Sequence, residues 1–200
     1  MGMERGGWRQ YPDQGLSKVL SAALSAFVER GYDGASIREI AARAGLSVPG
    51  VYHHYSSKQA LLVGLTNAVM VDLLNRSKAA IADAGPSASE RFDAVVESLL
   101  LFHMHRREQA FVASRETRSM ELEARNAYIA LRDEQQKLLD DIVRDGVASG
   151  EFGAKFPEDA SRAVTTMCVA VSTWYRPDGA LSPQELVERY LSIARSAVDA

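Results

Sequence analysis

Residues 36–58, SIREIAARAGLSVPGVYHHYSSK, predict two short helices joined by a tight turn. Ser36 and Glu39 have the spacing of a capping box, so the first helix begins at Ile37. Gly45 ends this helix, because glycine adopts the left-handed conformation at little cost. Ser47 caps the second helix, which leaves a turn of about three residues, as a helix-turn-helix requires. The buried stripe of the first helix consists of Ile37, Ile40, Ala41 and Ala44.

The second helix has an outer face without a carboxylate. Its inward positions, at helical spacing, are Val48, Val51, Tyr52 and Tyr55, which leaves Pro49, Gly50, His53 and His54 outside. Small residues at its start let the positive end of the helix dipole approach phosphates and base edges. The pattern predicts a DNA-reading helix; the alternative is a short surface helix with two solvated histidines. The predicted DNA contacts are Ser36, Arg38, Ser47, Pro49, Gly50, Tyr52, His53, His54 and Tyr55.

A further capping pattern, Ser56 with Gln59, predicts a long helix that begins near Ser57 and carries Lys58 in its first turn. The segment 15–65, with AFVERGYDGASIREIAARAGLSVPGVYHHYSSKQALL, resembles the DNA-binding domain of the tetracycline-repressor (TetR) family of bacterial transcription regulators. The resemblance implies a dimeric, all-helical repressor whose larger C-terminal domain senses a small molecule. It also implies that Lys58 contacts the DNA backbone and that the tilt of the long helix transmits ligand binding.

The charge distribution fits a protein that meets DNA at one end. The chain has 200 residues and a net charge of −3. Residues 15–62 carry five Lys or Arg against three Asp or Glu, while residues 63–200 carry the acidic excess. The single cysteine, Cys168, excludes an intramolecular disulfide and favours a reducing compartment. Without a membrane-length apolar run or a signal-peptide core, we expect a soluble cytoplasmic protein.

We expect an all-α chain of about nine helices in three parts. Residues 1–14, rich in glycine, predict a flexible arm that either reaches the minor groove of DNA or stays a disordered tail. Residues 15–62 form the helix-turn-helix domain, with a first helix that ends at Gly31 and offers Lys18 to the DNA backbone or to solvent. Residues 63–200 form the effector-binding and dimerisation domain.

One of the last two predicted helices lacks an ordinary solvent face. The helix that begins at Pro157 has one apolar face, with Cys168 and Val171, and an opposite face that is small and nearly uncharged, with Thr166 and Thr173. Such a helix is buried on both sides, so one face lines a core or chamber and the other can meet a second subunit. The TetR resemblance implies that the last two helices of each subunit form a four-helix dimer interface.

Two C-terminal stretches, LRDEQQKLLDDIVRDGVASGEF (131–152) and TWYRPDGALSPQEL (173–186), are similar to a TetR branch that regulates fatty-acid, steroid or related acid catabolism. Effectors of that branch are often acyl-CoA thioesters; other apolar molecules, or no effector, are the alternatives. Arginine suits a phosphate or carboxylate, so Arg115 and Arg118 are candidate anchors, with surface salt bridges to nearby glutamates as the alternative. Candidate chamber walls, which plain core packing also explains, are Met104, Phe111, Met120, Tyr128, Met167, Val171 and Trp174.

Catalytic and metal-binding patterns are lacking in the sequence. There is no phosphate-cradling glycine loop, nucleophile elbow or metal-spaced cluster, so we predict no catalytic residues, no metal and no cofactor. His103 and His105 point in different directions from one helix, and no further ligand completes a set. Three functions are weighed: a ligand-responsive repressor of a palindromic operator, an effector-free or architectural DNA-binding dimer, and an enzyme with an incidental helix-turn-helix.

Overall fold

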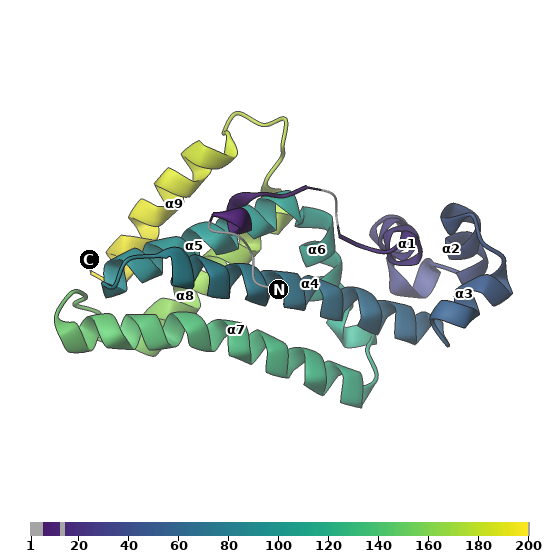
Figure 1. The fold of residues 1–200 in the computed structure, drawn as a ribbon, viewed down its shortest axis with the longest axis horizontal. Helices are drawn as coiled ribbons and strands as arrows, with labels where there is room; N and C mark the ends of the chain where they lie inside the picture. Colours follow the sequence, from purple (N-terminus) through teal and green to yellow (C-terminus); the bar gives the residue numbers. More distant parts are fainter. Residues whose placement is uncertain (1–5, 13–14, 200) are drawn as a thin grey trace. The chain divides into compact units, whose positions relative to one another are not determined.

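The computed structural model describes residues 6–12 and 15–199, and Figure 1 shows their helices. Within this part of the chain there are nine α-helices, two short 3-10 helices and no strand, which confirms the predicted all-α fold. None of these helices combines the length and apolar character needed to cross a bilayer. The elements in order are η1 (Gly7–Arg9), α1 (Lys18–Gly34), α2 (Ile37–Ala44), α3 (Val48–His54), α4 (Lys58–Asp83), α5 (Ala88–His105), α6 (Arg107–Arg115), η2 (Glu116–Ser119), α7 (Leu122–Ser149), α8 (Pro157–Trp174) and α9 (Pro183–Ala197).

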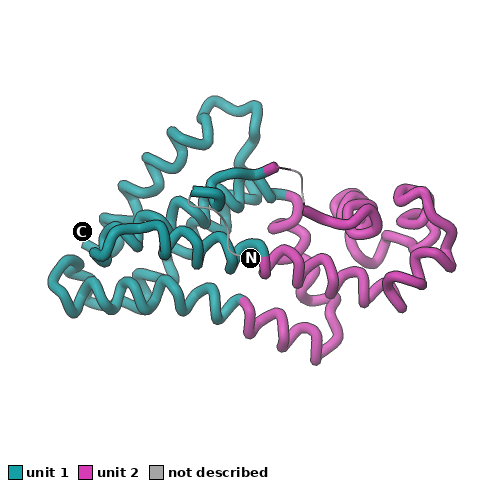
Figure 2. The backbone as a smooth tube through the Cα atoms, in the orientation of Figure 1, with its two compact units in different colours: residues 1–11, 72–107, 132–200 teal, residues 12–71, 108–131 magenta. Residues whose placement is uncertain are grey.

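The chain divides into two compact units, coloured separately in Figure 2. Unit 1 comprises residues 1–11, 72–107 and 132–200, and unit 2 comprises residues 12–71 and 108–131. Unit 2 therefore contains the helix-turn-helix together with most of α6, η2 and the first turns of α7. Helices α4 and α7 each continue without a break from one unit into the other.

Unit 2 is built around the first three helices and the start of α4. Ser17 caps α1 by accepting a hydrogen bond from the Leu20 N–H. The backbone leaves the helical conformation at Gly31, with φ 70° and ψ 169°, where the sequence predicted that this helix ends. This φ favours glycine over any residue with a Cβ atom. The buried core of the unit includes Leu24, Phe27, Ile40, Val51, Leu61, Leu62 and Leu65.

Unit 1 is built around α5, which packs against α8 and α9. Burial of apolar side chains on these helices supplies the main stabilising free energy of the unit. An ion pair joins α9 to α5: the Arg195 guanidinium donates to both carboxylate oxygens of Asp93, at 3.0 and 2.5 Å. The buried core of the unit includes Phe92, Val95, Leu99, Phe102, Leu139, Val143, Val164, Cys168, Val171 and Leu186.

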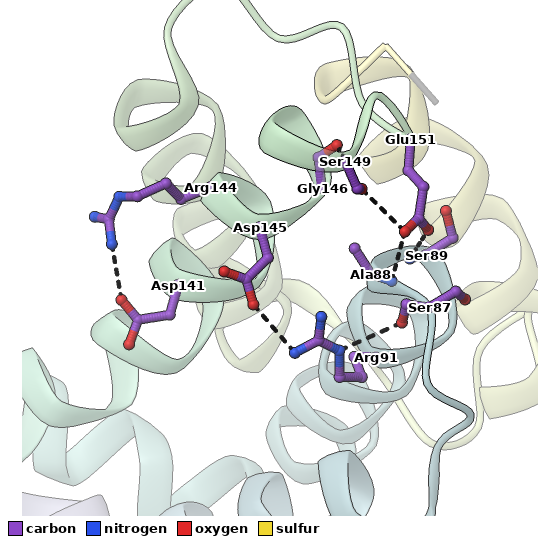
Figure 3. Close-up of polar contacts among 10 residues, drawn as sticks. All are labelled: Ser87, Ala88, Ser89, Arg91, Asp141, Arg144, Asp145, Gly146, Ser149 and Glu151. Carbon is purple, nitrogen blue, oxygen red and sulfur yellow. Dashed lines mark hydrogen bonds and ion pairs between the residues drawn. The ribbon is translucent and has the colours of Figure 1, made fainter.

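The loop after α7 caps the start of α5 (Figure 3). The Glu151 carboxylate accepts hydrogen bonds from the N–H groups of Ala88 and Ser89, at 3.1 and 3.0 Å. These bonds hold the pKa of Glu151 below its usual value, because they stabilise the charged carboxylate. A Cβ atom at Gly146 would clash with the ring of Phe152, so the chain can turn back here only over a glycine. Helix α7 ends at Ser149, and Gly150 follows with φ 78°, in the left-handed region that favours glycine.

Residues 6–11 pack on α4 and α5 within unit 1, which differs from the flexible arm that the sequence predicted over residues 1–14. Trp8 is 1% exposed and packs against alanines of α4 and α5. Its indole N–H donates to Asp83 Oδ2 at 3.1 Å, and the Arg76 guanidinium donates to the Trp8 carbonyl at 2.8 Å. Burial of the large apolar indole outweighs the freedom that the glycines offer. Residues 1–5 and 13–14 lie outside the described residues.

Two further contacts hold this segment. The ring of Tyr11 stacks on His105, with 4.5 Å between ring centroids, and lies 3.9 Å from the Arg76 guanidinium carbon. Arg9 donates to both carboxylate oxygens of Glu97, at 2.6 and 2.7 Å. Arg9, which belongs to the arm predicted either to reach the minor groove or to stay disordered, is thus engaged within unit 1.

Candidate DNA-binding site

The helix-turn-helix is assembled by side-chain caps. Ser36 accepts a hydrogen bond from the Glu39 N–H at 3.2 Å, and Ser47 accepts one from the Gly50 N–H at 3.1 Å. Gly45 has φ 66° and closes α2 in the left-handed conformation. Helices α2 and α3 begin at the predicted residues, which confirms the predicted spacing. The capping box at Ser36 is only half formed, because the Glu39 carboxylate binds arginines instead.

The helix-turn-helix domain, residues 15–62, forms the reading head of the protein. Two of its arginines join α1 to α2. Arg43 donates to Glu29 at 2.7 and 2.5 Å and to Glu39 at 2.6 Å, and Arg30 also binds Glu39, at 2.9 Å. The hydrogen bond from Arg43 lowers the pKa of Glu29. Arg30 and Arg43 thus balance Glu29 and Glu39, and the positive excess of residues 15–62 comes from Lys18, Arg38 and Lys58 against Asp33. Arg38, at the start of α2, is exposed and makes no ion pair among the described residues, so it keeps its charge for a ligand.

Helix α3 presents the predicted outer face. Val51 is fully buried, whereas Pro49, His53 and His54 are exposed, and the helix has no acidic residue. Tyr52 is 48% exposed, which corrects its predicted inward position and agrees with its inclusion among the DNA contacts. Val51 and Tyr52 fit the same helical spacing, so the packing of α3 on its neighbours, rather than the periodicity, leaves Tyr52 outside.

A groove of about 370 Å³ lies beside the helix-turn-helix within unit 2. It brings Lys18, at the start of α1, to the same hollow as His54, at the end of α3. Both side chains are exposed. Tyr55 is half buried, and its ring lies so close to Gly64 that a Cβ atom there would meet it at 2.7 Å. The full lining is Ser17, Lys18, Val19, Ala44, Gly45, Leu46, His54 and Tyr55.

Lys58 has a structural role in addition to the DNA contact implied by the TetR resemblance. Its ammonium donates to the carbonyls of Tyr32, Asp33 and Ala35, at 2.8, 3.4 and 3.0 Å. These carbonyls end α1, where a cation also meets the negative end of the helix dipole. The helix-start cap lies one residue later than predicted, because Ser57 rather than Ser56 accepts the Ala60 N–H. The contact between Lys58 and DNA stays a prediction.

Four of the predicted effector contacts belong to unit 1. Met104 and Val171 are buried in its core, and Met167 is half buried. Trp174 is 45% exposed and packs its ring against Tyr190, with 5.9 Å between centroids. Core packing thus accounts for Met104 and Val171, and Trp174 lies on the surface of a single chain.

The other five predicted contacts belong to unit 2. Met120 and Tyr128 are buried. Arg115 lies 3.8 Å from Glu116 and 5.7 Å from the ring of Phe111, which agrees with the salt-bridge alternative for this arginine. Arg118 is exposed and forms no ion pair among the described residues. A chamber that uses residues of both groups stays a prediction.

The two histidines at the end of α5 each contact other groups: His103 the Leu99 carbonyl and His105 the ring of Tyr11. Within residues 6–12 and 15–199 no group of three or more His, Cys, Asp or Glu side chains could hold a metal ion. His103 is 4% exposed, and its Nδ1 lies 2.7 Å from the Leu99 carbonyl. Burial lowers its pKa to about 4, so the ring is neutral at pH 7 and donates Nδ1–H to that carbonyl.

Several contacts of the head could not be found from sequence periodicity. Tyr32 and Gln59 are joined by a 2.9 Å contact between the hydroxyl and the side-chain amide, across 27 residues of sequence. Ser119 and Glu121 also lie at that amide. The sequence carries no signal for this contact, because the contact depends on how residues 116–121 pack against the helix-turn-helix domain in the tertiary structure.

Comparison with known proteins assigns the family. Residues 19–65 match the family model "Bacterial regulatory proteins, tetR family", and residues 85–198, more than half of the chain, match "Tetracyclin repressor-like, C-terminal domain". The chain is 27% identical over 183 residues to the HTH-type transcriptional repressor KstR2 of Mycobacterium tuberculosis, covering 90% of this chain and 91% of that protein.

Two other comparisons agree. The fatty acid metabolism regulator protein of Bacillus subtilis is 24% identical over 163 residues, covering 80% of this chain and 84% of that protein. A crystal structure of a TetR-family regulatory protein from Rhodococcus RHA1 superimposes with a TM-score of 0.84 at 28% identity, covering 92% of this chain and 96% of that one. This chain therefore belongs to the TetR family, and it is a DNA-binding transcription regulator rather than an enzyme.

Proposed function

We propose that the protein is a homodimeric, cytoplasmic repressor that leaves a palindromic operator when it binds a small molecule. The observation that carries the DNA-binding part is the outer face of α3. It is capped by Ser47, is free of carboxylates and exposes Tyr52 and His53. Arg38, at the start of α2 in the same unit, is exposed and forms no ion pair among the described residues. Such a face can enter the major groove, where bases are read, while neighbouring groups bind phosphates.

The groove beside α3 supplies a second proposed DNA contact. Lys18 and His54 lie at its lining, and a phosphate of the DNA backbone is the anion that a reading head meets. Phosphate contacts set the register of the protein on the duplex without reading sequence. Replacing Lys18 with alanine should therefore weaken binding to all DNA sequences about equally and lower the salt dependence, with the slope of log K against log[salt] falling by about 1.

The dimer is proposed from the faces of α8 and α9 that a single chain leaves open. On α8, Thr166, Ala170 and Thr173 are exposed beside Trp174, and on α9 Ile193 is 53% exposed. The named α8 residues carry no charge, and an uncharged face with exposed apolar side chains is typical of a subunit interface. Sedimentation tests this proposal: Ile193→Asp should convert the dimer to a monomer, whereas Ile129→Asp, which alters an exposed isoleucine of α7, should not.

An acyl-CoA or another fatty-acyl compound is the proposed effector. The similarity of residues 131–152 and 173–186 to regulators of acid catabolism supports this class, as does the fatty acid metabolism regulator among the relatives. Arg118 is an exposed cation in unit 2 that could bind the phosphate or carboxylate group of such an effector. An effector-free DNA-binding dimer is the alternative.

The deciding experiment follows dissociation of the protein from the DNA upstream of its own gene by fluorescence anisotropy. Short-chain and long-chain acyl-CoAs are added at micromolar concentrations, with the free acids and CoA as controls. Release by one thioester class supports the proposal, and that release should weaken in Arg118→Ala. DNA binding that no compound alters would favour the effector-free dimer. Failure to bind DNA would reject the proposal that the outer face of α3 reads DNA. If that proposal holds, Arg38→Ala should weaken DNA binding.

A further inference from the structure

The segment that joins α6 to α7 is part of the same compact unit as the helix-turn-helix. Residues 108–131 group with residues 12–71, as Figure 2 shows by colour. Within this unit η2 packs against α1. The sequence assigns this segment to the effector domain, so its contacts with the head are where an effector signal could enter.

One side chain makes two of these contacts, with Ser119 and Glu121, and a third with Tyr32 inside the head. The amide of Gln59, in the first turn of α4, satisfies its neighbours in a single orientation. In that orientation its nitrogen donates to Tyr32 Oη at 2.9 Å and to the Ser119 carbonyl at 3.2 Å, and its oxygen accepts from the Glu121 N–H at 2.8 Å. Gln59 thereby joins the end of α1, the start of α4 and the residue that precedes α7.

The residue next to Gln59 fixes the other side of the same junction. Lys58 donates to the Tyr32 carbonyl at 2.8 Å, and its ammonium lies 4.4 Å from the centroid of the Tyr32 ring. Tyr32 is therefore held at its carbonyl by Lys58 and at its hydroxyl by Gln59. Lys58 and Gln59 lie only four and five residues after the end of α3, so little chain separates this junction from the DNA-reading helix.

The segment itself is anchored by a buried carboxylate. Glu116 is 4% exposed and accepts a hydrogen bond from the Ser119 hydroxyl at 3.1 Å. A Cβ atom at Gly31 would lie 3.6 Å from Glu116 Oε1, so the kink of α1 and this carboxylate are neighbours. Burying a carboxylate costs free energy unless its oxygens are hydrogen-bonded, so the bond from the Ser119 hydroxyl stabilises Glu116 in its buried position and orders the segment around it.

We propose that Tyr32, Lys58, Gln59, Ser119 and Glu121 form a head clasp that couples the position of α7 to the orientation of the reading head. Helix α7 starts directly after Glu121 and continues without a break to Ser149, so a shift of α7 acts on the Gln59 amide through Glu121. The residues of the clasp are positioning residues, because none of them needs to touch the effector. This inference rests on the proposed function, since it assigns the regulation of the same reading head.

Hydrogen exchange of the full-length protein tests the clasp without a known effector. Gln59→Leu keeps the size of the side chain and removes all three hydrogen bonds. Amides in residues 119–122 and 30–35 should exchange roughly fivefold faster in this variant, as expected for the loss of hydrogen bonds of ordinary strength. Tyr32→Phe removes only the hydroxyl and should give part of the effect. Gln184→Leu, at an exposed position of α9, is the matched control and should give none.

The second arm adds DNA from upstream of the gene. In the wild-type protein, bound DNA should slow exchange in residues 119–122, which lie outside the reading helix. In Gln59→Leu the DNA should still bind, but the exchange rate in 119–122 should no longer respond to it. An equal response in both proteins, or no response in the wild type when DNA is bound, would overturn the clasp. If the wild type binds no DNA, the proposed function fails, and the DNA-free comparison still decides whether the clasp exists.

Discussion

Truncating Trp8 is expected to release the N-terminal segment from unit 1. The side chain is 1% exposed, and replacing a buried tryptophan with alanine lowers the free energy of unfolding by about 3 to 5 kcal/mol. The indole hydrogen bond to Asp83, 3.1 Å long, is lost as well. In a chain of this size 1 kcal/mol corresponds to about 2 to 4 °C in melting temperature. We therefore expect the Tm of Trp8→Ala to fall by roughly 10 °C.

Tryptophan fluorescence reports the same contact directly. The chain has two tryptophans, so Trp174→Phe leaves Trp8 as the single emitter. A docked indole should emit at a shorter wavelength than free tryptophan and should be protected from iodide quenching. Trp8→Phe keeps a buried aromatic ring but removes the N–H donor, so its loss of stability should be much smaller than that of Trp8→Ala.

Two results together would refute the docked segment. The first is emission typical of a water-exposed indole in the native single-tryptophan protein. The second is a melting temperature in Trp8→Ala equal to that of the wild type. In that case residues 6–11 would be the flexible arm that their glycine content predicts.

Three further perturbations test other contacts. Lys58→Met should lower the Tm by a few degrees, because the carbonyls at the end of α1 lose their cation. Lys18→Met makes the same change at a lysine without such partners and should leave the Tm unchanged. Parallel thermal melts of the two variants test this. Acid should destabilise the protein through His103, whose pKa burial lowers from 6.5 to about 4, because the unfolded chain then binds a proton that the folded chain excludes. Stability should fall between about pH 6.5 and 4 in the wild type, and this part of the pH dependence should be missing in His103→Gln. Cys168 should resist thiol reagents until the protein unfolds, because burial raises the pKa of its thiol to about 12; the rate of labelling with and without denaturant measures this.

Local chemistry written in the sequence was enough to predict the helix-turn-helix. Ser36 and Ser47 cap helices through bonds to N–H groups three residues away, and Gly45 takes a backbone conformation that its own lack of a Cβ atom favours. Such interactions span one turn of chain, so they can be read without knowing the rest of the fold. The all-helical architecture followed in the same way from apolar spacing.

Contacts between segments that lie far apart in the sequence could not be predicted in this way. Tyr52 and Val51 have the same helical signal, and only the packing of α3 on its neighbours makes one exposed and the other buried. Glycine-rich composition favours mobility for residues 6–11, but α4 and α5 offer an apolar surface that buries Trp8.

The sequence by itself thus determined the caps, the turn and the helices, because each depends on residues within about one helical turn. Only the tertiary structure decided that Lys58 closes the end of α1 and that Gln59 meets Ser119 and Glu121. Those contacts join residues that lie tens of positions apart, and the free energy that brings them together comes from burial of the whole core rather than from the residues themselves.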